Sequence, residues 1–372
     1  MRFPEFSGEW EEEQLDSIAT LSKGIGISKE QLSEDGEPCI LYGELYTKYK
    51  SEIIKQVESK TDIDCSKLKR SKANDVIIPC SGETAVDIAT ARCVPFDNIL
   101  LGGDLNIISL HKYDGAFMSY QLNGKRKYDI ARVAQGVSVV HLYGEHLKAI
   151  KTYNPSLPEQ QKIAKLLSLI DERIATQNKI IEDLKKLKSA ISLKMLHSDS
   201  WKQFKIKDIA SIGRGRVISS VEISQQDNPL YPVYSSQTSN EGIMGYLDNF
   251  MFEGEYINWT TDGANAGTVF YRDGKFNCTN VCGLLKLGDE FDTYFVSLVL
   301  AEATKKYVST NLANPKLMNN TMGSIQIRLP KLKEQKRISI AFRKLRELLE
   351  VHNSLLTEYS KLKQYLLSQM FI

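Results

Sequence analysis

The chain has 372 residues, of which 42% are hydrophobic and 25% are charged, and its formal net charge at pH 7 is +2. This composition is typical of a folded protein with room for two or three domains, and it excludes a disordered, a collagen-like and a membrane-embedded chain. The small net charge excludes a surface that is basic all over, so binding of nucleic acid would need basic side chains gathered on one face.

Neither the apolar stretches nor the cysteines indicate a special environment. The longest apolar runs, such as Val76–Pro79 and Ile99–Leu101, are far shorter than the roughly 18 residues that a membrane span needs. The opening residues MRFPEF lack the apolar core of a signal peptide. Only Cys278 and Cys282 lie close together, so neither a disulfide framework nor a metal site is indicated. We expect a protein of the reducing cytoplasm without membrane contact.

The first 154 residues form a globular region that we predict to be mixed α/β. Strand-like runs occur at Val76–Ile78 and Val137–His141, and Tyr113–Leu122 is predicted to be helical. Glycine-containing turn pairs are dense in this region, as expected for short strands joined by loops.

A long helix is predicted over residues 155–198. Pro155 and Pro158 stand at its start, where proline is tolerated, and no further proline or glycine occurs until after Leu196. At a rise of 1.5 Å per residue, about 40 residues extend over roughly 60 Å, which is too long for a helix that only fills the core of one small domain.

A second globular region at 199–329 and a second long helix at 330–372 complete the chain. We predict strands at Thr268–Tyr271 and Ile325–Leu329 and a helix at Phe291–Ala303. The two helical segments are net basic and the two globular regions are net acidic.

The two halves of the chain are an internal repeat. Pro155–Ile163 (PSLPEQQKI) recurs as Pro330–Ile338 (PKLKEQKRI), and the opening of the first region around Trp10 recurs at Trp201. The order globular, helix, globular, helix follows, with the same local structure expected in both halves.

Both helices carry a seven-residue apolar repeat in the same register. Each also has a polar residue in the third position of one row, Gln177 or His352, and a lysine in the fourth position of the other, Lys188 or Lys363. The remaining row residues are our candidates for the spacer and partner interface: Ile163, Leu167, Ile170, Ile174, Ile181 and Leu184 in the first helix, and Ile338, Phe342, Leu345, Leu349, Leu356 and Tyr359 in the second.

Further apolar residues widen the helix stripe beyond a two-stranded seam. They include Leu169 and Leu187 in the first helix and Leu348 and Leu362 in the second. A stripe this wide predicts that helices of partner proteins cover part of it.

Motifs for catalysis and metal binding are lacking. The sequence contains no phosphate-binding loop, no His-Glu-x-x-His and no nucleophile elbow. The carboxylates at Asp289–Asp292 are interpreted as a solvated helix start. His352, in a core row, is interpreted as a structural histidine with its hydrogen bonds satisfied.

Two globular regions, each followed by Pro-x-Leu-x-Glu-Gln-x-x-Ile and a long amphipathic helix, resemble the specificity subunit of a type I restriction-modification enzyme. The openings at Trp10 to Gly24 and at Trp201–Ala210 resemble the starts of the target recognition domains of that family. The resemblance covers essentially the whole chain.

The resemblance implies an α+β fold, in which two mixed α/β target recognition domains are separated by two long antiparallel coiled-coil helices with pseudo-twofold symmetry. The domains would be residues 1–154 and 199–329, and the conserved spacer helices residues 155–198 and 330–372. Each domain would recognise one half of a bipartite target in double-stranded DNA, and the helices would set the spacing of the halves.

The resemblance also implies a non-catalytic chain that works with other subunits. Two methylation subunits would dock on the helices, and restriction subunits would join them. S-adenosylmethionine, ATP and Mg would be bound by those partners and no cofactor by this chain.

Candidate DNA-binding residues are polar or basic side chains in predicted loops, since these can contact base edges and phosphates. In the first region they are Lys69, Arg70, Lys72, Ser81, Thr84, Lys125, Arg126 and Lys127. In the second region they are Arg214, Arg216, Ser235, Ser236, Gln237, Asn265, Thr268, Lys305 and Lys306.

Other functions remain open on the sequence. The chain could serve a different modification system of the same plan, or be a coiled-coil interaction scaffold, which would show no salt-dependent affinity for DNA. An enzyme such as a nuclease would have to use the carboxylates at Asp289–Asp292.

Overall fold

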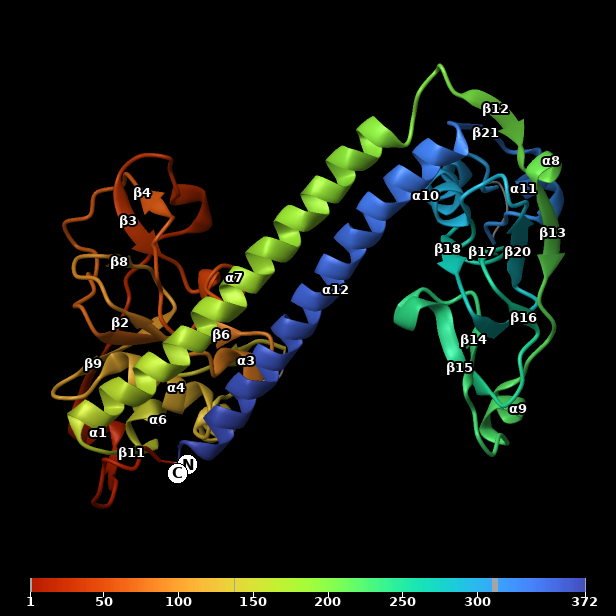
Figure 1. Cartoon of the computed structure of the whole chain (residues 1–372). Coiled ribbons are helices and arrows are strands. Elements are labelled where there is room, and N and C mark those ends of the chain that lie inside the picture. Colours follow the sequence, from red (N-terminus) through yellow and green to blue (C-terminus); the bar gives the residue numbers. More distant parts are fainter. Residues whose placement is uncertain (1, 137, 310–313, 372) are drawn as a thin grey trace. The chain divides into compact units, whose positions relative to one another are not determined.

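The computed structural model describes residues 2–136, 138–309 and 314–371. The chain divides into two compact units, one made of residues 1–180 and 352–372 and the other of residues 181–351. Each unit contains one globular part and a stretch of both long helices, α7 (Leu157–Met195) and α12 (Leu332–Gln369) (Figure 1). The predicted fold class, α+β with two globular domains and two long helices packed together, is confirmed.

The globular part of the first unit is built on an antiparallel sheet of order β2-β9-β5-β7. These strands are β2 (Ala19–Lys23), β9 (Leu105–Leu110), β5 (Asp75–Pro79) and β7 (Arg92–Val94). Strand β5 is buried along its whole length, which explains its uninterrupted apolar run.

Smaller sheets and short helices surround this sheet. Strand β3 (Glu37–Ile40) lies between β4 (Lys60–Thr61) and β8 (Leu100–Leu101), antiparallel to the former and parallel to the latter. Two further pairs are β1 (Glu11–Gln14) with β11 (Lys151–Asn154), and β6 (Ser81–Gly82) with β10 (Val140–His141). The helices are α1 (Leu15–Ile18), α2 (Glu44–Thr47), α3 (Ala85–Ile88), α4 (Gly115–Asn123), α5 (Lys127–Val133) and α6 (Gly144–Lys148), with a 3₁₀ turn at Lys29–Gln31.

The globular part of the second unit has the same plan. Its main sheet has the order β13-β20-β17-β18, with β13 (Ala210–Arg214), β20 (Cys282–Leu287), β17 (Tyr256–Thr260) and β18 (Val269–Arg272). Its second sheet is β15 (Ile243–Leu247), β14 (Tyr231–Tyr234), β19 (Lys275–Cys278) and β16 (Phe252–Glu253), and β12 (Lys202–Lys205) pairs with β21 (Gln326–Leu329). The helices are α8 (Ile206–Ile209), α9 (Ser220–Ser224), α10 (Thr293–Ala303) and α11 (Asn319–Ser324), with 3₁₀ turns at Ser239–Gly242 and Thr304–Lys306.

The strand register confirms that the halves are structural repeats. In the first unit Val76 of β5 pairs with Ile108 of β9, and in the second Ile257 of β17 pairs with Leu285 of β20. The parallel pair β3–β8 has its counterpart in β14–β19. Loops that extend from equivalent strand ends in the two units are therefore themselves equivalent.

Most elements predicted from the sequence are observed. The strands predicted at Val76–Ile78, Thr268–Tyr271 and Ile325–Leu329 and the helices predicted at Tyr113–Leu122 and Phe291–Ala303 are seen as β5, β18, β21, α4 and α10, within two residues at each end. Of the run Val137–His141, only Val140–His141 pairs as a strand; Gly136 before it has a left-handed φ of 122°, and Val137 lies outside the described residues.

A buried glutamine joins each globular part to the long helix that follows it. Gln160, 1% exposed, donates from Nε2 to the carbonyl oxygen of Pro155 (2.8 Å) and accepts at Oε1 from the backbone N–H of Asp114 (2.9 Å). Asp114 is in turn the N-cap of α4. This double hydrogen bond ties the first turn of α7 to the first turn of α4.

The same bridge recurs in the second unit. Gln335 donates to Pro330 O (2.8 Å) and accepts from the N–H of Asp292 (3.0 Å), which is the N-cap of α10. The glutamine of the repeated Pro-x-Leu-x-Glu-Gln motif thus has a structural role in both halves.

The two long helices pack antiparallel within each unit (Figure 1). In the first unit the start of α7, with Ile163 and Leu167, shares an apolar core with Leu366 and Met370 near the end of α12. In the second unit the end of α7 and the start of α12 share a core that includes Leu196, Ile338 and Phe342.

The polar residues in the third position of the heptad row meet each other. His352 Nδ1 and Gln177 Oε1 are 2.7 Å apart, and both residues belong to the first unit. His352 therefore has a hydrogen-bond partner within the helix pair, as expected for a structural histidine.

Candidate nucleic-acid interface

In the second unit, several loops meet at one end of the two sheets. Gly215 follows β13 and lies so close to the β19–β20 turn that a Cβ on it would be 2.0 Å from the carbonyl oxygen of Cys278. The N–H of Arg216 donates to that oxygen (3.2 Å), and the N–H of Thr279 donates to Tyr234 O at the end of β14 (2.9 Å). The ends of β13 and β14 are therefore held next to each other.

The loop between β17 and β18 joins the same group. Asn265 Nδ2 donates to the carbonyl oxygen of Ser236 (3.3 Å), and the N–H of Thr268 donates to Asn265 O (3.1 Å). We call this set, Arg214–Arg216, Ser235–Gln237, Asn265–Thr268 and Thr279–Val281, the second loop edge. It unites seven of the nine DNA-binding candidates of the second region: Arg214, Arg216, Ser235, Ser236, Gln237, Asn265 and Thr268.

Two basic side chains at or near the second loop edge form ion pairs that are partly open to solvent. Arg216 forms a two-pronged ion pair with Glu222 of α9, which raises the pKa of the arginine and lowers the pKa of the carboxyl. Lys316, which the sequence analysis did not select, lies 3.7 Å from Asp262. Because exposed ion pairs of this kind contribute little to stability, Arg216 can exchange its carboxylate for another anion at little cost.

The other two candidates of the second region lie apart from the loop edge. Lys305 is paired with Glu302 of α10 (2.8 Å). Lys306 lines a cavity of about 430 Å³ beside His197 and Arg328.

The first unit has an equivalent edge, made of Lys23–Ile25, Leu41–Gly43, Ser81–Thr84 and Gly102–Asp104, which we call the first loop edge. Gly24 occupies the place of Gly215, since a Cβ on it would lie 2.0 Å from Gly102 O. The N–H of Gly102 donates to Ile40 O at the end of β3 (2.9 Å), and the N–H of Cys80 donates to Asp104 O (2.7 Å).

Only two of the eight candidates in the first region belong to this edge, Ser81 and Thr84. The hydroxyl of Thr84 is the N-cap of α3 and accepts from the N–H of Asp87 (3.1 Å). Ser81 lies beside His141 (3.4 Å), whose ring stacks on Tyr143. Lys23 and the half-exposed Tyr143 extend the polar surface of this edge, and sequence reasoning missed both.

The Lys69–Lys72 cluster lies at the opposite end of the main sheet. Lys69, Arg70 and Lys72 line a cavity of about 320 Å³ near His111, which follows the last residue of β9. The guanidinium of Arg70 forms a two-pronged ion pair with Glu37 and lowers the pKa of that carboxyl.

The third cluster, Lys125–Lys127, lies at the start of α5. Arg126 pairs with Asp129 (3.5 Å) and its guanidinium lies over the ring of Tyr153 (5.2 Å). Neighbouring Gly124 approaches the end of α12, since a Cβ on it would lie 3.4 Å from Leu367 O. The three clusters of the first region therefore lie at three different elements: before β5, before α3 and at the start of α5.

A buried arginine supports the second loop edge from below. Arg272, 4% exposed, has its guanidinium 3.6 Å from the centre of the Tyr234 ring and 4.4 Å from that of Phe270. Burial lowers the pKa of this arginine. No sequence signal marked it, because it ends an ordinary strand, VFYR.

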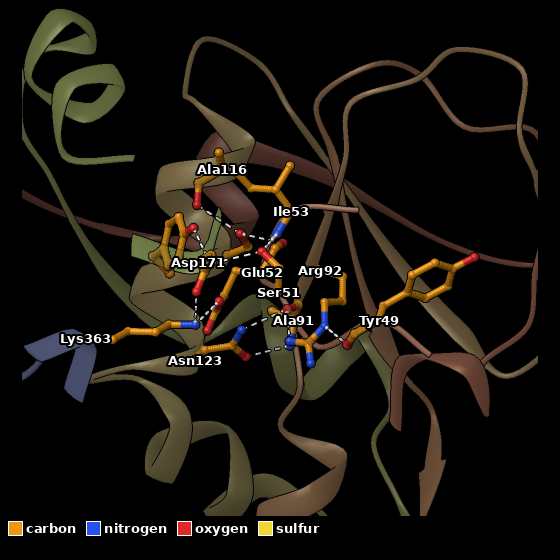
Figure 2. Close-up of polar contacts among 12 residues, drawn as sticks. Tyr49, Ser51, Glu52, Ile53, Ala91, Arg92, Ala116, Asn123, Asp171 and Lys363 are labelled. Carbon is orange, nitrogen blue, oxygen red and sulfur yellow. Dashed lines mark hydrogen bonds and ion pairs between the residues drawn. The ribbon is translucent and has the colours of Figure 1, made fainter. Parts of the chain in front are cut away.

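In the first unit a buried ionic cluster fixes α12 against α7 and the globular part (Figure 2). Lys363 Nζ lies 2.5 Å from Glu52 and 2.7 Å from Asp171 of α7, and Tyr120 OH donates to Asp171 (2.7 Å). Burial raises the pKa of Glu52, and Lys363 opposes that shift. Its repeat equivalent Lys188 is exposed, so this cluster distinguishes the first unit from the second.

All twelve spacer candidates are buried or half-buried: Ile163, Leu167, Ile170, Ile174, Ile181, Leu184, Ile338, Phe342, Leu345, Leu349, Leu356 and Tyr359. A second set of apolar side chains is exposed. It includes Leu169, Leu187, Leu348 and Leu362, each more than 40% exposed. These are the residues that widen the stripe in the sequence.

The acidic, histidine and cysteine side chains that the structure describes do not gather into a metal site. They contain no group of three or more His, Cys, Asp or Glu side chains that could hold a metal ion. Asp292 of the Asp289–Asp292 cluster caps α10. No helix within residues 2–136, 138–309 and 314–371 is long and apolar enough to cross a membrane.

Comparison with known proteins identifies the family. The model of the type I restriction modification DNA specificity domain matches this chain twice, over residues 7–186 and 198–359. The chain belongs to the type I restriction-modification DNA specificity family. It is therefore a DNA specificity subunit, which is a non-catalytic part of such a system.

Similar proteins are known from mycoplasmas. A Mycoplasma pneumoniae protein named as a type I specificity subunit is 37% identical over 198 residues, which cover 51% of this chain and 82% of the relative. The specificity subunit of the M. pneumoniae type I restriction enzyme MpnII is 42% identical over 147 residues, or 38% of this chain and 44% of that protein.

Solved structures share the fold of this specificity subunit. The S subunit of a type I restriction-modification system from M. genitalium has a TM-score of 0.74 at 18% identity, covering 100% of this chain and 99% of that one. A chain from a study of the assembly and conformational transition of a type I system has a TM-score of 0.54 at 13% identity, covering 98% and 97%.

Proposed function

We propose that the domains at residues 1–154 and 199–329 each recognise one half of a bipartite sequence in double-stranded DNA. The observation that carries this proposal is the pair of loop edges. In both units these loops extend from equivalent strand ends of repeated sheets. Their side chains differ: the second edge offers Arg214, Ser236 and Asn265, and the first offers Lys23 and Ser81. One scaffold with two different polar edges suits the recognition of two different short sequences.

The helices at 155–198 and 330–372 act in this proposal as the spacer and as the docking surface for two methylation subunits. The exposed apolar residues Leu169, Leu187, Leu348 and Leu362 would be covered by these partners, since exposed apolar stripes mark interaction surfaces. Restriction subunits would join this core, and S-adenosylmethionine, ATP and Mg would be bound by the partners. The assembly would act on DNA in the cytoplasm.

Base recognition is assigned to the two loop edges. The remaining basic candidates, Lys69, Arg70, Lys72, Lys125, Arg126, Lys127, Lys305 and Lys306, are assigned to phosphates or to solvent. This division rests on their positions away from the equivalent strand ends.

The test is a methylation map. The chain is co-expressed with its modification subunits in a host without adenine methylation, and N6-methyladenine is located by sequencing. Two short specific blocks separated by a fixed unspecific gap are expected. Replacing residues 199–329 with the corresponding region of a relative should change one block only. DNA that stays unmethylated although the subunits co-purify would contradict the proposal.

Paired variants test the loop edge itself. Replacing Arg214 and Ser236 by alanine should relax one block of the motif, because these side chains offer base-edge contacts. Replacing Lys69 and Lys72 by alanine removes two charges at the other end of a sheet and should leave both blocks unchanged. If the two double variants had the same effect, the assignment to the loop edge would be wrong.

A further inference from the structure

The loop Ser235–Gly242, which begins in the second loop edge and leads to β15, has an unusual backbone. Asn240 (φ 49°), Glu241 (φ 51°) and Gly242 (φ 85°) are three consecutive residues in the left-handed region. Side-chain-bearing residues rarely adopt this conformation, and two in succession need support from their surroundings. Such residues concentrate where a loop must keep one shape for its function.

Besides the bond from Asn265 Nδ2 to Ser236 O, the following hydrogen bonds hold this loop in shape. The N–H of Ser235 donates to Gly242 O (2.8 Å), Gln237 Nε2 donates to Ile243 O, and Arg272 Nη2 donates to Glu241 O (2.6 Å). The first two come from the loop itself. Arg272 is the contact from the underlying sheet, and it meets the loop at the left-handed residues.

Arg272 is costly to bury. Its side chain lies over the rings of Tyr234 and Phe270, and the charge of Glu241 only partly offsets the effect of burial. Burying a charge is unfavourable, so a residue that merely filled this space would be apolar. The guanidinium is used for its directed donor to Glu241 O and for its stacking on two rings.

The first unit places its buried arginine at a different position of the equivalent strand: Arg92 of β7 donates to the carbonyl oxygens of Tyr49 and Ala91 (both 2.9 Å). The first pair of β17 and β18 is Tyr256 with Arg272, and the equivalent first pair of β5 and β7 is Asp75 with Val94. The position of Arg272 is thus taken by a valine in the first repeat. Whatever Arg272 does for DNA recognition is confined to the second domain.

We propose that Arg272 is a positioning residue that holds the Ser235–Gly242 loop in the shape that recognises one half of the DNA target. This proposal rests on the proposed function of the second domain. Arg272 acts through the loop, and Ser236 and Asn240 are the side chains that it presents to the bases.

The experiment maps methylation by the full-length chain, co-expressed with its modification subunits, in the Arg272→Met and Arg272→Lys variants. In Arg272→Met, discrimination among sequences in the block of the second domain should fall about tenfold or more, as expected for losing one good base contact. The other block should be unchanged. Arg272→Lys keeps the charge and a donor and should recover part of the discrimination.

Two further variants separate positioning from folding. Gly242→Ala would bring a Cβ to 3.2 Å from Gln237 O and 3.3 Å from Arg272 Nη2 at a φ of 85°, so it strains the loop where Arg272 meets it and should relax the same block without a change in the core. Arg343→Met is the matched control. Arg343 also lies over two rings, those of Tyr271 and Tyr294, and neither ring belongs to the Ser235–Gly242 loop. It should leave both blocks unchanged.

The outcomes are distinct. A wild-type chain that gives no split motif refutes the proposed function. A split motif that is unchanged in both Arg272→Met and Gly242→Ala overturns the role of Arg272 alone. Equal loss of both blocks in these variants also overturns it, because the effect would then be a general loss of folding or assembly.

Discussion

Removing Lys363 should destabilise the first unit far more than removing its repeat equivalent, Lys188. In Lys363→Met, Glu52 and Asp171 lose the ammonium group that lies within 2.7 Å of each, and both carboxylates are more than 90% buried. Breaking a buried ion pair by removing one partner costs about 3–5 kcal/mol, and the 15% exposure of Lys363 favours the lower end. Lys188→Met changes an exposed side chain and should alter the stability by less than about 0.5 kcal/mol.

Thermal unfolding of the full-length variants measures this difference. At roughly 2–4 °C per kcal/mol for a unit of this size, Lys363→Met should lower the Tm of the first unit by roughly 6–12 °C. The two units are to be followed separately, because they can unfold in separate transitions. Equal Tm values for Lys363→Met and Lys188→Met would refute the argument.

The pH dependence provides a second check of the same prediction. Burial raises the pKa of Glu52 in the folded chain, and removing Lys363 removes the charge that opposes this shift. A carboxyl whose pKa is raised by folding binds protons more tightly in the folded state, so stability is lost as the pH rises through that pKa. The deficit of Lys363→Met should therefore shrink when the pH is lowered from about 7.5 to about 5.5. A deficit that grows on acidification would mean that Glu52 is not the group responsible.

Three further predictions follow from the joints, turns and helix faces. Gln335→Leu should cost about 2 kcal/mol or more in unfolding experiments, because two backbone groups lose their buried partner. Gly215→Ala should destabilise the second unit and weaken DNA recognition, since the new Cβ would meet Cys278 O, whereas Gly213→Ala, with open space around it, should not; equal unfolding midpoints would contradict this. Leu362→Lys should make the isolated chain more soluble but reduce co-purification with the modification subunits, and undiminished co-purification would exclude this face as their docking site.

The helical framework could be predicted because its signals are local. The absence of proline and glycine, the heptad rows and the repeated Pro-x-Leu-x-Glu-Gln motif are all visible within 40 residues of sequence. The pairing of Gln177 with His352 fits the same register. The glutamine of the motif is visible as a repeated residue, but the sequence does not indicate that Asp114 and Asp292 are its hydrogen-bond partners.

The surface was harder to predict because position depends on long-range strand pairing. The three basic or polar clusters of the first region looked alike in the sequence, yet Lys69–Lys72 and Ser81–Thr84 lie at opposite ends of a single strand, β5. In the second region seven of the nine candidates, among them Arg214, Arg216 and Asn265, lie together at one end of the sheets. Arg272 escaped notice, since nothing in a strand sequence tells that an arginine will be buried between two rings.

The glutamine bridges have a consequence for how such chains can diversify. The hydrogen bonds of the Gln160 and Gln335 side chains go to backbone atoms: a proline carbonyl and the N–H at the start of a helix. Hydrogen bonds to backbone groups do not depend on which side chains the domain has. The side chains of a loop edge can therefore change while the hydrogen bonds between the domain and its long helix are kept. We expect a domain of this kind to be exchangeable for that of a relative without a change in the helices.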